Sequence, residues 1–310
     1  MTRISTSSSY SGVLANLMAA QQRQMEAGDK LATQKNGTDL KGYARNAEML
    51  TAMSSVHTRI QGYLSQNTMV SQKLATQDQA LNQVADAATR VRQRIAEALA
   101  TGSGDGLMLD MESAFRDAVS GLNARFAGKP LFGGGQVSID PVSAQTLTDL
   151  TAPLATIPGF FKNDQFVATS KVDDSTEVTT GFLADGLGTD MLTAFQGMQA
   201  FEEGGTGSFG GKLTTAQENF LMGQLQVWEG VASDLTNEAA KNGMVQRRVE
   251  DVGQDLVRRQ DMMGGMIGDV VDADMAEVVA QLKQAELSVN AAAQVFATLR
   301  ESSLLNLLRP

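Results

Sequence analysis

The chain has no cysteine and a single histidine among its 310 residues. Without Cys the chain has no thiol nucleophile. Zinc sites are built mainly from Cys and His, so a single His makes a zinc site very unfavourable. The one histidine, His57, lies on the apolar stripe of a long helical pattern, and no nucleophile turn accompanies it. We interpret it as a packing residue and predict no catalytic, metal-binding or cofactor-binding site, and no enzyme activity.

Aromatic residues are also scarce, at 5%, whereas apolar residues as a whole make up 42% of the chain. A sizeable core is therefore possible, and the composition favours helices of Ala, Leu, Met, Val and Gln over a β-sandwich. The formal net charge of −10 disfavours polyanionic partners. We expect neither nucleic-acid binding nor membrane binding.

Long apolar runs are absent as well. No stretch of the sequence approaches the ~18 apolar residues of a membrane span, and residues 1–22 lack the apolar core of a cleaved signal peptide. If the protein leaves the cell, we expect a route that does not cleave a signal.

Apolar residues recur at spacings of three and four over most of the chain, which is the period of an amphipathic helix. The pattern predicts helices over residues 9–34, 45–100, 107–127, 188–201 and 214–263. At ~1.5 Å per residue the second of these would be roughly 80 Å long, so we expect a helical rod built from antiparallel coiled-coil helices. Glycine-rich stretches separate the helices.

Residues 136–185 have a different character, because three prolines and several Asp, Asn and Gly residues interrupt them. Short runs with β-branched residues, Gln165–Val172 and Thr176–Phe182, lie between these turn signals. The segment predicts a small β-rich insert in a mainly α-helical fold.

The last helical pattern is the most regular in the chain. Its apolar positions alternate by four and three, at Val271, Met275, Val278, Leu282, Ala285, Val289, Ala292, Phe296 and Leu299. This spacing is that of a coiled-coil seam. The seam runs into the apolar C-terminal stretch ESSLLNLLRP.

Both ends of the chain carry few charges. Residues 1–22 contain only Arg3, and residues 287–310 contain only Arg300, Glu301 and Arg309. A helix that is solvated by itself has a charged outer face, so we expect the two ends to pair with each other and with copies of themselves. The predicted assembly interface comprises Tyr10, Leu14, Leu17, Met18, Met25, Leu31, Val278, Leu282, Val289, Phe296, Leu299, Leu304, Leu305, Leu307 and Leu308.

Three motifs that suggest ligands have simpler interpretations. GTGSFG, residues 205–210, matches a dinucleotide fingerprint, but no strand precedes it, so we interpret it as an inter-helix loop. LFGGG, residues 131–135, is interpreted as a domain junction. The acidic stretch DVVDADMAE, residues 269–277, lacks the spacing of a Ca²⁺ loop and predicts a helix start capped by Asp272 or Asp274.

The C-terminal stretch IGDVVDADMAEVVAQLKQAELSVNAAAQVFATLRESSLLNLLRP, residues 267–310, resembles the end of the bacterial flagellin family. TRISTS, residues 2–7, and LFGGG are similar to the hook–filament junction branch of that family. Residues 33–47 depart from the family's usual pattern. The resemblance covers about residues 1–135 and 186–310 and leaves the middle uncovered.

The resemblance implies a fold with paired terminal helices, long coiled-coil helices and a variable middle. It also implies a structural role: a secreted, extracellular flagellar component that is exported unfolded through the flagellar type III channel. The implied partners are other copies in a ring or helical stack, a hook-associated protein on the hook side, flagellin on the filament side and a cytoplasmic export chaperone. The implied domains are residues 1–43 with 268–310, 44–135 with 186–267, and 136–185.

Alternative functions remain open from the sequence. The first is a filament flagellin or minor flagellin. The second is a helical ligand-binding protein whose loops at 131–135 and 202–211 hold a small molecule. The third is a coiled-coil adaptor.

Overall fold

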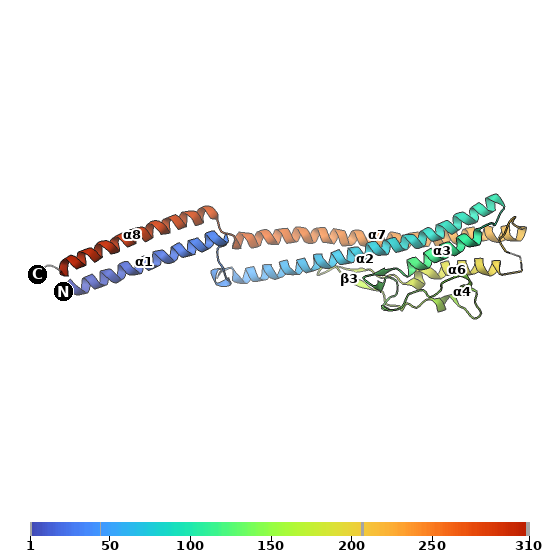
Figure 1. Cartoon of the computed structure of the whole chain (residues 1–310), viewed down its shortest axis with the longest axis horizontal. Coiled ribbons are helices and arrows are strands. Elements are labelled where there is room, and N and C mark those ends of the chain that lie inside the picture. The colour runs from blue at the N-terminus through green and yellow to red at the C-terminus, as the bar shows by residue number, and fades with distance from the viewer. Residues whose placement is uncertain (1, 44, 206–207, 308–310) are drawn as a thin grey trace. The chain divides into compact units, whose positions relative to one another are not determined.

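The computed structural model describes residues 2–43, 45–205 and 208–307, and most of them are helical (Figure 1). The long elements are the helices α1 (Thr2–Thr33), α2 (Ala47–Thr101), α3 (Leu107–Leu122), α6 (Ala184–Glu202), α7 (Thr215–Val271) and α8 (Met275–Leu307). The short ones are η1 (Leu40–Tyr43), β1 (Arg125–Phe126), β2 (Lys129–Pro130), α4 (Leu147–Leu150), α5 (Ile157–Phe160), β3 (Thr169–Lys171) and β4 (Glu177–Thr179).

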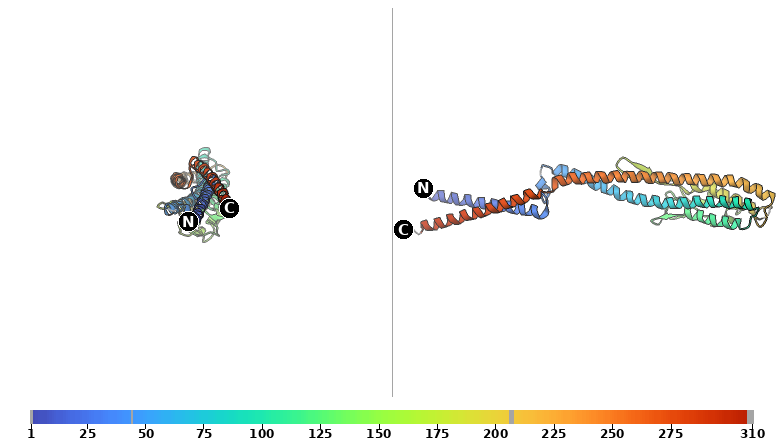
Figure 2. Two further views of the ribbon diagram at one scale, coloured as in Figure 1. Left: turned by 90° about the vertical axis from the view of Figure 1, so that its left-hand side faces the viewer. Right: turned by 90° about the horizontal axis from the view of Figure 1, so that it is seen from above.

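The chain forms two compact units. The first contains residues 1–59 and 259–310, and the second contains residues 60–258. In the first unit α1 lies beside α8, and in the second α2 lies beside α7 (Figures 1 and 2). The predicted fold class, mainly helical with paired terminal and long helices, is confirmed, while the finer three-part division stays a prediction.

The third predicted helix is shorter than its apolar pattern suggests. It was predicted to continue to residue 127, but α3 ends at Leu122. Ala127 and Gly128 both have positive φ, at 49° and 80°. That conformation is the one a tight two-residue hairpin needs, so the chain turns back there and β1 pairs antiparallel with β2.

The core of the second unit lies where α3 and α6 join the α2–α7 pair. Phe195 of α6 stands between Phe115 of α3, with ring centroids 5.4 Å apart, and Trp228 of α7, at 4.6 Å, both edge-on. All three side chains are fully buried. A Cβ on Gly121 would come within 2.7 Å of a Val84 methyl, so glycine allows α3 to approach α2 closely.

The insert contains less strand than predicted. The β3–β4 hairpin falls within the two predicted β-type runs, but α4, α5 and irregular chain make up much of the rest. The insert lies against α2 through this hairpin: the Gln66 and Asn67 side-chain amides donate to the carbonyls of Lys171 and Val172, at 2.8 and 3.1 Å. The three-residue strands therefore depend on a helix for support, because a lone hairpin is marginally stable.

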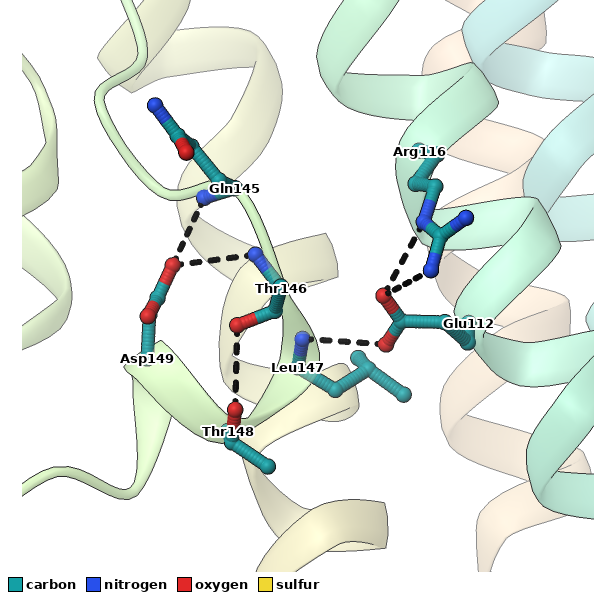
Figure 3. Close-up of polar contacts among 7 residues, drawn as sticks. All are labelled: Glu112, Arg116, Gln145, Thr146, Leu147, Thr148 and Asp149. Atoms are coloured by element: carbon teal, nitrogen blue, oxygen red, sulfur yellow. Dashed lines mark hydrogen bonds and ion pairs between the residues drawn. The ribbon is translucent and has the colours of Figure 1, made fainter.

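Helix α4 is fixed at its N-terminus by two carboxylates (Figure 3). Asp149, at the third helical position, accepts the backbone N–H groups of Gln145 and Thr146 at 2.8 and 2.9 Å. Glu112 of α3 accepts the backbone N–H of Leu147 at 3.1 Å. These contacts satisfy amides that have no partner inside so short a helix, and they attach the insert to α3.

The LFGGG loop encloses a carboxylate of the chain itself. One oxygen of Asp164 accepts the backbone N–H groups of Gly135 and Phe166, at 2.8 and 2.9 Å. These bonds hold the pKa of Asp164 below its usual value, with the Gly135 amide the larger cause. A Cβ on Gly134, which has φ 67°, would meet that oxygen at 2.3 Å, so only glycine fits.

We expect Phe195→Ala to lower the free energy of unfolding by about 3–5 kcal/mol, because it empties the space between two buried aromatic rings. Chemical denaturation followed by the fluorescence of Trp228, the only tryptophan, measures this. Phe166→Ala is the matched control, since Phe166 is 61% exposed. Equal losses in the two variants would contradict the assignment of the core.

We expect Asp164→Asn to lower the melting temperature at pH 7. A carboxylate with a depressed pKa stabilises the fold above its unfolded pKa, about 3.8–3.9, and that stability is lost as pH falls through the folded pKa. The difference between wild type and variant should therefore shrink in thermal melts below about pH 4. Asp86→Asn, which removes an exposed carboxylate from α2, is the control.

Candidate assembly surface

The two ends of the chain pair with each other through small side chains. Helices α1 and α8 run antiparallel, and among the side chains described, at residues 11–33 and 275–298, the buried ones are Ala20 and Ala27 of α1 and Val278 and Ala285 of α8, each 3–5% exposed. Alanines allow two helix backbones to approach closely. The contact therefore buries alanines fully and larger residues of α1, such as Leu17 and Leu31, only in part.

Three of the larger apolar side chains of α1 face outward, whereas Leu17 and Leu31 are half-buried. Leu14, Met18 and Met25 are 42%, 62% and 64% exposed. With 3.6 residues per turn, they form a stripe about 150° around the helix from the seam centred on Ala20 and Ala27. This outward stripe of Leu14, Met18 and Met25 is apolar surface without cover from α8.

A small network joins the ends of three helices. Gln34, with φ 58°, ends α1, and its carbonyl accepts the Ala273 N–H at 3.0 Å. The backbone N–H of Asn36 donates to the Val271 carbonyl at 2.8 Å, and its side-chain amide donates to the Asp272 carbonyl at 2.8 Å. These bonds hold the end of α1 against the connection from α7 to α8.

The acidic stretch after α7 caps a helix, as predicted. Asp274 accepts the backbone N–H groups of Ala276 and Glu277 at 2.9 and 3.3 Å, so it is the N-cap of α8. The helix therefore begins at Met275 rather than at Val271, which belongs to α7. In the part of the chain that the structure describes, no group of three acidic or histidine side chains is arranged to hold a metal ion.

The described side chains of the predicted interface fall into three groups: outward-facing, buried and half-buried. Leu14, Met18 and Met25 face outward, whereas Val278 is buried. Leu17, Leu31, Leu282, Val289 and Phe296 are half-buried. For Tyr10, Leu299, Leu304, Leu305 and Leu307 only the helical backbone is described, and Leu308 lies outside the described residues. The sequence had assigned all of them to one surface.

Three exposed apolar residues of α8 were missed by the sequence reasoning. Val279, Leu287 and Val295 are 39%, 69% and 50% exposed. They lie between the seam positions of the heptad pattern. That pattern identifies only the seam positions, so it does not select these three residues. An apolar residue at a position where a helix would normally be charged was the available signal.

The residues that could have bound a ligand make contacts within the chain itself. Phe209, in the loop at 202–211, is 5% exposed and stacks on Phe201 at 5.3 Å, and its backbone N–H donates to Glu202 at 2.7 Å. The LFGGG amides hold Asp164, and His57 is half-buried on α2. No helix among the described residues is long and apolar enough to span a membrane.

Comparison with known proteins agrees with the sequence resemblance. Residues 225–308 match the model of the bacterial flagellin C-terminal helical region, so the resemblance is confirmed over that part of the chain. A search of curated proteins gave no match.

Two solved structures share the fold. A Vibrio parahaemolyticus protein described as a flagellar hook-associated protein is 12% identical, with a TM-score of 0.58 over 73% of this chain and 97% of its own. FlgL of Bacillus cereus is 14% identical, with a TM-score of 0.54 over 71% of this chain and 99% of its own. At these identities the similarity establishes the fold.

We expect Asp274→Ala to weaken the start of α8 by about 1 kcal/mol, the usual loss on removing an N-cap. Hydrogen exchange at the amides of Ala276, Glu277 and Val278 should become faster by several-fold. Asp269→Ala removes a nearby exposed carboxylate and should leave these amides unchanged. Identical exchange in both variants would show that Asp274 does not cap the helix.

Proposed function

We propose that this chain is a structural component of the bacterial flagellum, a hook-associated protein of the type that joins hook to filament. The observation that carries the proposal is the flagellin C-terminal helical region at residues 225–308, on a fold shared with hook-associated proteins. This structural role requires no cofactor, because it consists of assembly with other subunits.

Assembly would use apolar surface that one copy cannot cover. The α1–α8 pair buries alanines and leaves the outward stripe exposed. Contacts between different patches of identical subunits generate rings or helical arrays. In such an array the outward stripe of one copy packs against the terminal helices of the next, and covering one Leu or Met completely contributes about 1.5–3 kcal/mol.

The partners follow from this role. We infer that neighbouring copies contact the terminal helices, with a hook-associated protein on the hook side and flagellin on the filament side. Before export, a cytoplasmic chaperone would cover the apolar end of the C-terminal helix. The mature protein would then be extracellular, in the flagellum.

Removing the last residues should abolish assembly and leave the fold intact. We expect a chain lacking Leu304–Pro310 to keep its helical circular dichroism but to fail to restore filaments in a strain without its own junction protein. Met18→Gln with Met25→Gln should act in the same way, because these polar side chains interrupt the outward stripe. Normal filament growth with either variant would refute the proposal.

The control and the main alternative can be tested in the same strain. Phe166→Gln changes an exposed apolar residue of the insert and should leave filament growth unaffected. A filament flagellin is the second candidate, because the family region that matches this chain is described as flagellin's. Long filaments formed by the purified protein alone would favour it, whereas capture on isolated hooks without such polymerisation favours the junction role.

A further inference from the structure

Two amide side chains are fully buried between α2 and α7. Gln77 and Asn242 are both 0% exposed, and the Gln77 amide donates to the side-chain oxygen of Asn242 at 3.1 Å. The Asn242 amide donates to the backbone carbonyl of Leu74 at 3.0 Å, and the Gln246 amide reaches the same carbonyl at 2.8 Å. We call Gln77 and Asn242 the amide layer.

The amide layer interrupts two otherwise apolar heptad series. On α2 the buried positions spaced by seven are Val70, Gln77, Val84, Val91 and Ala98. On α7 they are Trp228, Leu235, Asn242, Val249 and Leu256. Each series contains one polar residue, and the two polar residues bond to each other.

The layer also lies at the end of the apolar core. The core cluster includes Ala80 of α2 and Ala239 of α7, and Gln77 and Asn242 are the next buried positions beyond them. On the far side of the layer, the buried residues of α7 are Val249, Val252 and Leu256. Those of α2 are also aliphatic apart from Asn67, whose amide donates to the Val172 carbonyl. Aliphatic side chains pack with similar energy in more than one alignment. Aliphatic seams by themselves specify register weakly.

A shift of one heptad would break the amide layer. Gln77 would then face Leu235 or Val249, and Asn242 would face Val70 or Val84. Both amides would be buried without a partner, which is strongly unfavourable. The native layer is itself imperfect, since Gln77 Oε1 accepts no hydrogen bond within the described part of the chain. If stability alone had selected the residues at positions 77 and 242, both would be aliphatic.

We propose that Gln77 and Asn242 determine the register in which α2 pairs with α7. The layer acts by penalising the shifted pairings, as single buried polar residues do in coiled coils. The inference concerns the pairing within one chain and does not depend on the proposed flagellar role.

The test measures register after refolding, when the helices must choose it anew. The chain has no cysteine, so Gln79→Cys with Glu250→Cys gives two unique sites, both exposed, for nitroxide labels. After dilution from denaturant, pulsed electron paramagnetic resonance should give one distance. With Gln77→Leu and Asn242→Leu added, we expect a second distance, from pairings in which one helix is shifted along the other by about 10 Å, one heptad at 1.5 Å per residue.

Matched variants separate register from stability. The exchange Gln77→Asn with Asn242→Gln keeps both amides and should keep one distance. Gln72→Leu with Arg248→Leu adds leucines at exposed positions of the same helices and should also keep one distance. The double-leucine protein should melt at or above the wild-type temperature, whereas Gln77→Leu alone should melt lower.

Two results would overturn the proposal. One is a single wild-type distance in the refolded double-leucine protein, which would place register control elsewhere. The other is a double-leucine protein that does not regain helical circular dichroism, because an aliphatic layer should pack at least as well as the amides.

Discussion

The structure depends on the need of each long helix for a partner. Helices α2 and α7 have 55 and 57 residues, and each has an apolar stripe along one side. Isolated helices are marginal in water, and in proteins their stability comes mostly from burying such a stripe. Antiparallel pairing of α2 with α7, and of α1 with α8, buries these stripes. Helices α3 and α6 and the insert pack onto the α2–α7 pair.

The two helix pairs bury their apolar stripes with different side chains. In the second unit the α2–α7 pair is part of a larger core, in which Phe195 contacts both Phe115 and Trp228. In the first unit the fully buried residues among the described side chains are Ala20, Ala27, Val278 and Ala285, and larger apolar residues such as Leu17 and Leu282 are only half-buried. A unit with this seam retains apolar surface for contacts with other molecules, which is the property that an assembly protein needs.

The polar contacts have local and specific roles. Carboxylates accept hydrogen bonds from backbone amides at helix starts and in a loop: Asp149 at α4, Asp274 at α8 and Asp164 at the LFGGG loop. None of these contacts builds a core, but each fixes where a segment begins. The amides of Gln77 and Asn242 differ because they are buried. An unpaired buried amide costs about 1–3 kcal/mol, so their pairing restricts how the long helices align.

The sequence by itself determined the long helices, their order, the cap at Asp274 and the flagellin-like C-terminus, because each depends on spacing along one chain. It overran α3 to residue 127, since the hairpin at Ala127 and Gly128 lacks a strong turn signal. Only the tertiary structure decided which apolar residues face the partner helix and which face outward, such as Met18 and Met25. It also decided that Gln77 meets Asn242, a pairing across 165 residues. Periodicity defines the faces of a helix, but the choice of partner for each face is made by packing between distant segments.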